Sequence, residues 1–99
     1  MDYIKPNNTG FTVYTKSGCR YCDLVKKLLN DHKFNFFIVN CDNYILENKS
    51  VFLAFLSNVS QQNINTFPVV FNGTNYIGGY NETNKYIQEI NAFFELNDF

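Results

Sequence analysis

The chain has 99 residues, of which 45% are hydrophobic and 18% aromatic, so it can bury the core of one small domain. Its net charge of −1 argues against binding to nucleic acid through phosphate contacts. No apolar stretch approaches the roughly 20 residues of a membrane span. We therefore expect one domain over residues 1–99, with residues 1–10 as a loose polar lead-in and with no membrane or nucleic-acid partner.

The first half of the chain predicts a strand, a helix and a second strand. Residues 11–14 are rich in β-formers, and a period of 3.6 begins near Arg20. The residues on the apolar face of this helix are Val25, Leu28, Leu29 and His32. Residues 34–39 are almost continuously apolar, which is typical of a buried strand. This order predicts a right-handed βαβ unit with parallel strands.

The second half begins with a helix over residues 51–59, followed by a polar loop over 60–65. Two short apolar runs within residues 69–77 then flank Asn72 and Gly73, which are typical of a tight hairpin turn. The sequence contains no internal repeat and no linker to a second domain.

A last helix follows the hairpin, with Asn81 expected at its N-cap. The residues expected on its buried side are Tyr86, Ile87, Ile90, Phe93 and Phe94. The complete order of elements is therefore β-α-β-α-β-β-α, an α/β domain.

Cys19 and Cys22 stand three residues apart where the first helix begins. A helix N-terminus favours a thiolate, so the pair can supply an attacking and a resolving thiol. Two alternative interpretations of the cysteines stay open. They are a pair of apolar residues that packs the start of the helix, and one half of a metal site. An internal zinc site would need ligands besides Cys19 and Cys22. The remaining candidates are Cys41 and the single His32, and the sequence has no second CxxC pair. We expect Cys41 to be a buried apolar residue and assign His32 no catalytic role.

The charge of the chain is divided unevenly. Residues 1–33 hold six basic and three acidic side chains, whereas residues 34–99 hold two basic and six acidic ones. The cysteine pair lies in the basic third. Because only three cysteines are present, a disulfide framework is excluded, and we expect a reducing compartment, the cytoplasm.

Three motifs in order resemble those of glutaredoxins. They are TKSGCRYC at residues 15–22, Thr66-Phe67-Pro68, and Gly78-Gly79 followed by Tyr80-Asn81-Glu82. The resemblance covers residues 11–95 and implies the thioredoxin fold, a four-stranded mixed sheet with helices on both faces. It also implies a cis proline at position 68, so that the backbone of Phe67 faces the cysteines.

The resemblance implies that the protein is a monomeric, glutathione-dependent thiol–disulfide oxidoreductase. Its substrates would be protein disulfides and protein–glutathione mixed disulfides, with Cys19 attacking and Cys22 resolving. Glutathione would be the reducing co-substrate, with no metal or organic cofactor required. The residues implied in glutathione binding are Lys16, Arg20, Tyr21, Thr66, Phe67, Pro68, Gly79, Tyr80, Asn81 and Glu82.

Two departures from the family pattern leave alternatives open. Arg20 replaces the usual proline, a change that some family members combine with a glutathione-ligated [2Fe–2S] cluster shared by two chains. The loop before Thr66 has no arginine or lysine that could bind the glycine carboxylate of glutathione. Gln61 or Gln62 are the candidates for this contact. The same absence allows a redoxin that is reduced by a flavoprotein reductase.

Overall fold

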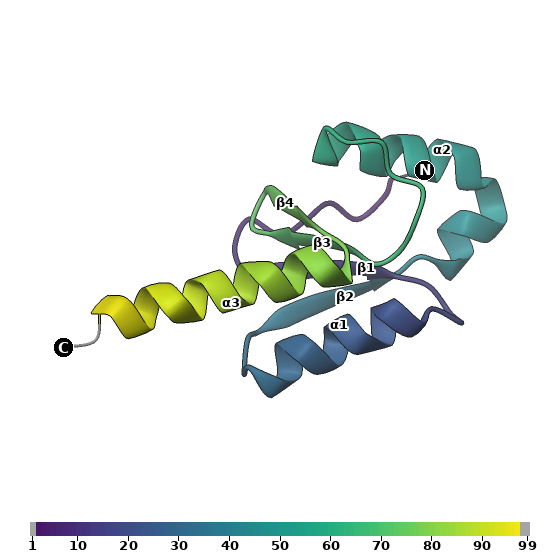
Figure 1. The fold of residues 1–99 in the computed structure, drawn as a ribbon. Coiled ribbons are helices and arrows are strands. Elements are labelled where there is room, and N and C mark those ends of the chain that lie inside the picture. The colour runs from purple at the N-terminus through teal and green to yellow at the C-terminus, as the bar shows by residue number, and fades with distance from the viewer. Residues whose placement is uncertain (1, 98–99) are drawn as a thin grey trace.

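The computed structural model describes the backbone of residues 2–97 and the side chains of residues 2–93. It has the predicted order of strands and helices (Figure 1). In chain order the elements are β1 (Phe11–Thr15), α1 (Arg20–Asp31), β2 (Phe36–Asn40), α2 (Asp42–Ser60), β3 (Val69–Asn72), β4 (Asn75–Gly78) and α3 (Tyr80–Asn97).

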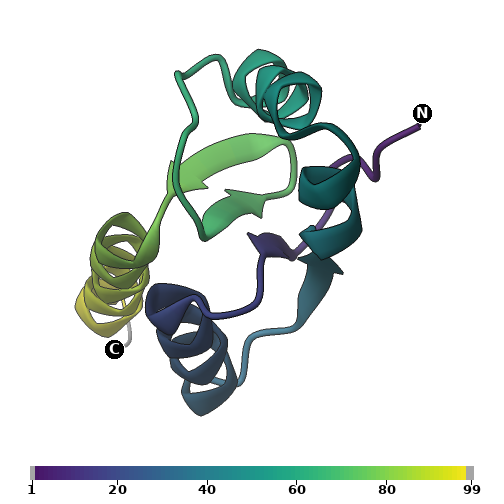
Figure 2. The same cartoon turned by 90° about the vertical axis from the view of Figure 1, so that its right-hand side faces the viewer.

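The four strands form one mixed sheet in the order β2-β1-β3-β4. β1 pairs parallel with β2 and antiparallel with β3, and β3 pairs antiparallel with β4. Helix α2 lies on one face of the sheet, and α1 and α3 lie together on the other (Figure 2). These are the layers of the thioredoxin fold, as expected from the motifs.

The alternation of β1 divides the core into two clusters, one on each face. Phe11 and Val13 point toward α1 and α3, whereas Tyr14 points toward α2. Because every residue of β1 is buried, this strand anchors both layers. The remaining buried members of the α1 and α3 side are Val25, Leu29, Val70 and Ile87. Those of the α2 side are Val39, Cys41, Phe52, Leu56, Ile64, Val69 and Phe71.

β2 is not the fully buried strand that its apolar run predicted. It begins at Phe36 rather than residue 34 and occupies an edge of the sheet, where Phe37 is 45% exposed. Phe34 lies in the preceding loop and packs its ring edge-on against Phe11 at 5.3 Å. The apolar run over residues 34–39 therefore includes a loop residue and an exposed strand residue as well as core residues.

Helix α2 begins nine residues earlier than the predicted helix at 51–59. Its two parts meet at Asn48, whose backbone is extended and whose Oδ1 accepts a hydrogen bond from Val51 N at 3.2 Å. Asn48 therefore caps the second part, and this part carries the helical periodicity seen in the sequence. The first part is short and polar except for Tyr44, Ile45 and Leu46, which gave no clear period.

The N-terminal segment is packed, contrary to the expectation of a loose lead-in. The Tyr3 ring lies 4.9–5.1 Å from three aromatic rings of α2, those of Tyr44, Phe52 and Phe55. The hydroxyl of Tyr14 donates a hydrogen bond to the Ile4 carbonyl at 2.6 Å. These contacts tie residues 3 and 4 to α2 and to the sheet.

The hairpin turn lies one position later than predicted, and the last helix begins two positions earlier. Asn72 belongs to β3 and pairs with Asn75, so that Gly73 and Thr74 form the turn, with a positive φ at Gly73. Helix α3 begins at Tyr80, which places Asn81 inside the first turn.

The buried side of α3 is shorter than predicted. Ile87 is fully buried, and Tyr86 and Ile90 are partly buried, but Phe93 is 62% exposed. Phe93 was expected to be buried because it continues the apolar period. The C-terminal part of α3 projects past the end of the sheet, however (Figure 1), which accounts for the exposure of Phe93. The side chain of Phe94 lies outside the described residues.

We predict that Tyr14→Phe lowers the free energy of unfolding by about 1 kcal/mol, the usual net worth of one hydrogen bond. The substitution removes only the hydroxyl that holds Ile4, while the ring stays in the core. Urea denaturation followed by circular dichroism measures the change. Tyr21→Phe, at an exposed ring, is the control and should leave the midpoint unaltered. Equal midpoints for all three proteins would contradict the assigned role of this hydrogen bond.

Candidate active site

The cysteine pair lies at the start of α1. Cys19 is the N-cap, with an extended backbone, and its Sγ accepts a hydrogen bond from Cys22 N at 3.1 Å. The two cysteines are joined by a disulfide across a Cα–Cα distance of 5.2 Å. Cys22 is fully buried, whereas Cys19 is partly exposed. An accessible sulfur is therefore joined to a shielded one.

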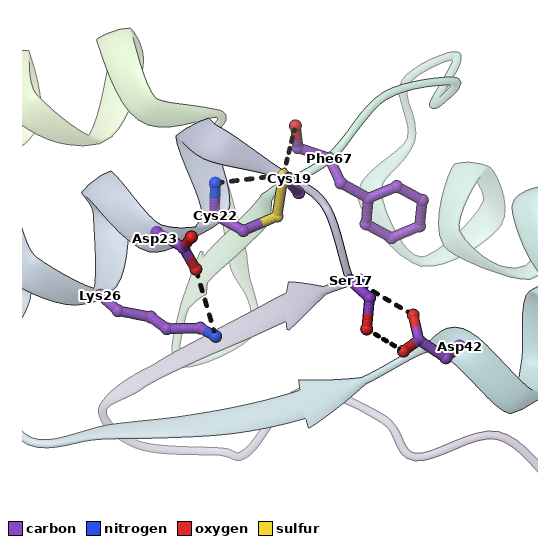
Figure 3. Close-up of polar contacts among 7 residues, drawn as sticks. All are labelled: Ser17, Cys19, Cys22, Asp23, Lys26, Asp42 and Phe67. Atoms are coloured by element: carbon purple, nitrogen blue, oxygen red, sulfur yellow. Dashed lines mark hydrogen bonds and ion pairs between the residues drawn. A yellow bond between two sulfur atoms is a disulfide. The ribbon is translucent and has the colours of Figure 1, made fainter.

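The loop before Cys19 is held by α2. Ser17 donates two hydrogen bonds to the carboxylate of Asp42, from its backbone N at 2.8 Å and from its hydroxyl (Figure 3). Asp42 is the first residue of α2, and its own N–H is bonded to Asn40 Oδ1 at 2.9 Å. Gly18 follows with φ +67°, a conformation that favours glycine. The clamp thus fixes where the helix carrying Cys19 begins.

The segment Thr66–Pro68 faces Cys19 from the other side. The Phe67–Pro68 peptide bond is cis, as predicted, and the Phe67 carbonyl oxygen lies 3.7 Å from Cys19 Sγ. The Phe67 ring points away from the sulfur (Figure 3) and stacks toward Phe52 at 6.5 Å. The backbone of Phe67 is therefore next to the reactive pair, while its side chain belongs to the α2 layer.

A groove of about 490 Å³ opens beside this backbone. Of the residues expected to bind glutathione, it is lined by Tyr21, Thr66, Phe67, Pro68, Gly79, Tyr80, Asn81 and Glu82. The rings of Tyr21 and Tyr80 approach to 6.0 Å, which joins the start of α1 to the start of α3. Three motifs that are distant in the sequence thus meet in one concave site.

The two remaining predicted residues lie outside this groove. Lys16 lines a smaller neighbouring pocket of about 220 Å³. Arg20 is an exposed residue at the start of α1 and lines neither space. Gln61 and Gln62 are also exposed and line neither. Gln61 ends α2 in a left-handed conformation and donates its side-chain N–H to the Asn58 carbonyl at 2.7 Å.

The diglycine shapes the start of α3 around Glu82. The Glu82 carboxylate accepts a hydrogen bond from Gly79 N at 2.8 Å, and the Gly79 carbonyl accepts one from Thr83 Oγ1 at 2.7 Å. A Cβ on Gly78 would come within 2.5 Å of Glu82 Cβ. Gly78 thus gives Glu82 room to fold back, and Gly79 takes the capping position expected of Asn81.

Sequence reasoning missed several residues of the site. Asn63, Ile64, Asn65 and Tyr76 also line the groove. The first three lie in a loop without periodicity, and Tyr76 is an ordinary β-strand residue in the sequence. Asp42 had no signal because its partner Ser17 lies 25 positions away.

In Tyr76, burial raises the pKa of the hydroxyl, and Glu82 adds to this effect.

Cys41 and His32 take no part in the site. Cys41 is fully buried at the N-cap of α2, and its N–H donates to the Thr15 carbonyl at 2.8 Å. Burial raises the pKa of its thiol to about 12. His32 is exposed, because α1 ends at Asp31 and leaves it as the C-cap rather than on the apolar face. Among the described residues, no group of three His, Cys, Asp or Glu side chains could hold a metal ion.

The thioredoxin fold with a disulfide-bonded CxxC pair at a helix N-terminus and a facing cis proline defines the class of thiol–disulfide oxidoreductases. The family model for glutaredoxin matches residues 11–77. The chain therefore belongs to the glutaredoxin family. No curated protein matches the chain. Within residues 2–97, no helix has both the length and the apolar character needed to cross a membrane.

Solved structures of glutaredoxins resemble this fold over most of the chain. Glutaredoxin 1 of Francisella tularensis, in complex with cacodylate, is 27% identical, with a TM-score of 0.70 over 81% of this chain and 93% of that one. The holo form of glutaredoxin C1 of Populus tremula x tremuloides is 28% identical, with a TM-score of 0.68 over 91% and 85%. A buckwheat glutaredoxin–glutathione complex is 26% identical, with a TM-score of 0.65 over 84% and 72%.

We predict that the Cys41 thiol does not react in the folded protein. With a pKa of about 12, roughly one part in ten thousand is thiolate at pH 8, against about a quarter in an unfolded chain. The variant with both Cys19→Ser and Cys22→Ser isolates this thiol. Titration with a chromogenic disulfide reagent should proceed only in denaturant. Equal rates in the folded and unfolded protein would contradict the prediction.

We predict that Asp42→Asn destabilises the protein at neutral pH but not in acid. The hydrogen bonds from Ser17 hold the pKa of Asp42 below its ordinary value of 3.8. A carboxylate of this kind stabilises the fold above its ordinary pKa, and the contribution is lost as the pH falls through the lowered value. The difference in unfolding midpoint from wild type should therefore shrink below pH 3.8. Asp2→Asn, in the N-terminal segment, is the control for net charge, and a difference independent of pH would refute the assignment.

Proposed function

We propose that this protein is a glutathione-dependent oxidoreductase that reduces protein disulfides and protein–glutathione mixed disulfides. The observation that carries the proposal is the position of Cys19. Its sulfur lies 3.7 Å from the carbonyl oxygen of Phe67, a residue that lines the groove of about 490 Å³. The glutathione in the complex of the buckwheat relative supports this choice of ligand.

The first step is attack by the Cys19 thiolate on a disulfide sulfur of the substrate. An S–S bond forms to Cys19 as the substrate S–S bond breaks, and the departing thiolate takes up a proton from water. The N–H of Cys22 points at Cys19 Sγ in the disulfide form and, in the reduced form, can donate to its thiolate. The unpaired N–H groups at the start of α1 favour the same negative charge.

Backbone groups position the incoming disulfide. The Phe67 carbonyl can accept an N–H of the bound peptide, as a neighbouring strand would. Across the groove, the first turn of α3 offers the N–H groups of Tyr80 and Asn81 to a carboxylate. Glu82 lies beside them and can pair with an ammonium group. A γ-glutamyl group carries both charges and therefore suits this end of the groove.

The mixed disulfide on Cys19 can be resolved in two ways. A glutathione thiolate can attack it, which releases oxidised glutathione when Cys19 holds a glutathionyl group. Alternatively, Cys22 attacks Cys19, and the substrate leaves as a thiol. This second route leaves a Cys19–Cys22 disulfide, for which the pair has the required spacing, and two glutathione molecules then reduce it.

The test is the reduction of a glutathionylated peptide supplied only with glutathione, glutathione reductase and its nicotinamide cofactor. Wild type should turn over. Cys19→Ser should lose turnover, at least about a hundredfold, because it removes the attacking sulfur. Cys22→Ser should keep it, because glutathione alone can resolve the glutathionyl intermediate. Oxidation of the cofactor, followed by absorbance, measures all three proteins.

A second substrate separates the two cysteines further. For a peptide with an internal disulfide, Cys22→Ser should also lose turnover, because without Cys22 the freed second thiol of the peptide attacks the mixed disulfide and re-forms the internal disulfide. An inactive wild type would contradict glutathione dependence and favour the redoxin fed by a flavoprotein reductase. A brown, dimeric protein after anaerobic purification would instead favour the [2Fe–2S] hypothesis. The monomeric state and the cytoplasmic location stay predictions.

A further inference from the structure

The two outer edges of the sheet differ in their protection against a further strand. β4 has four residues, and its pairing with β3 is interrupted by a register shift between Val70 and Phe71. Short strands and bulges are devices by which natural sheets block their edges. β2, at the other edge, has five residues, FFIVN, without a charged residue or a proline. The free edge of β2 is therefore open to pairing.

The backbone groups that face outward from β2 follow from one hydrogen bond. The N–H of Cys41 donates to the Thr15 carbonyl of β1 at 2.8 Å, so Cys41 directs its backbone groups inward. Inward and outward groups alternate along a strand, and Val39 and Phe37 therefore also face β1. Figure 2 shows β2 at the margin of the sheet, with α1 and α2 over the two faces. The residues whose N–H and carbonyl groups face outward are Phe36, Ile38 and Asn40.

The side chains of β2 are apolar on both faces of the sheet. Phe37 alternates with its neighbours toward the face of α2, where it is exposed. Phe36 and Ile38 lie half-buried against the cluster on the face of α1. An edge strand usually carries a charged side chain that prevents association. Because β2 lacks one, an added strand would cover apolar surface on both faces.

The charges next to β2 favour an antiparallel partner strand. Lys33 precedes the strand and is exposed, and Asp42 follows it. The acidic side chain closest to Lys33 in the sequence, Asp31, is already paired with Lys27 at 2.7 Å. Antiparallel pairing of two copies brings the basic end of each strand to the acidic end of the other, whereas parallel pairing brings like charges together.

We propose that β2 is a homodimer interface, in which two copies pair their β2 strands antiparallel about a two-fold axis at Ile38. The outward N–H and carbonyl groups of Ile38 bond to those of the partner's Ile38, and those of Phe36 bond to the partner's Asn40. A second copy fits this edge because it offers matching outward groups and the opposite charge at each end. The contact is isologous and therefore closes at two chains. It departs from the monomer implied by the family resemblance.

This dimer leaves both active sites open. β1 and β2 are parallel, so they end at the same side of the sheet, where Cys19 follows β1. In an antiparallel dimer these two sides point in opposite directions, which keeps the Cys19 sulfur of each copy away from that of the other. The dimer therefore differs from one that shares an iron–sulfur cluster between two Cys19 residues, and it does not rest on the proposed function.

The first experiment is sedimentation equilibrium of wild type with dithiothreitol and a chelator, from about 10 µM to about 1 mM. The mean mass should rise from the 11.6 kDa of one chain toward twice that value. Phe37→Lys should raise the dissociation constant at least about tenfold, because the change occurs in both copies and the two lysines are diagonal neighbours. Circular dichroism checks that the variant is folded.

Three further proteins serve as controls. Phe93→Lys makes the same exchange at an exposed site of α3, on the opposite side of the molecule from β2 (Figure 2), and should associate as wild type does. A mixture of Phe37→Lys and Phe37→Glu should recover the dimer, because the two diagonal charges then attract each other. Cys19→Ser should also form it, since the contact needs neither a disulfide nor a cluster.

The second experiment locates the contact by amide hydrogen exchange, followed by NMR at low and high protein concentration. The N–H groups of Phe37 and Val39 bond to β1 and should be protected at both concentrations. The outward N–H groups should gain protection with concentration in wild type, but not in Phe37→Lys. The outward N–H groups are those of Phe36, Ile38 and Asn40.

A dimer in which the Ile38 amide becomes protected supports the proposal. A mass of one chain up to about 1 mM would overturn it. So would a dimer that persists in Phe37→Lys or that leaves the Ile38 amide unprotected, since either result places the contact elsewhere. Loss of the dimer in Cys19→Ser would show association through the active site instead. Aggregates without a fixed size would contradict a closed two-fold contact.

Discussion

The active site depends on the register between β1 and β3. These strands are antiparallel and pair Tyr14 with Val69, so the end of β1 lies beside the start of β3. Cys19 follows Tyr14 by five residues and Phe67 precedes Val69 by two, which brings both to the same edge of the sheet. A slip by one residue would turn the side chains of β3 to the opposite faces and separate the two. The complete burial of β1 makes such a slip costly.

Helix α2 joins this edge from the other face of the sheet. Its first residue, Asp42, clamps the loop before Cys19 by accepting two hydrogen bonds from Ser17. Its second part packs against Tyr3 and holds the ring of Phe67 through Phe52. One element therefore fixes the loop before the sulfur and packs against the Phe67 segment that faces it.

The sequence was sufficient for the order of elements and for the motifs, because both depend on local patterns. Helix periodicity, the presence of a hairpin near Gly73 and the cysteine spacing are all visible within short windows. It was not sufficient where tertiary position decides. The apolar run of β2 looked buried, but a strand at the edge of a sheet leaves Phe37 exposed. Phe93 kept the helical period of α3 beyond the point where the sheet ends.

The same distinction applies within the candidate site. The residues of the three motifs could be selected in advance, since each motif is a continuous segment. Asp42 could not, because its partner Ser17 lies 25 positions away in the sequence. The kink of α2 at Asn48 could not be predicted either, because a single extended residue within a helix leaves no periodic trace in the sequence.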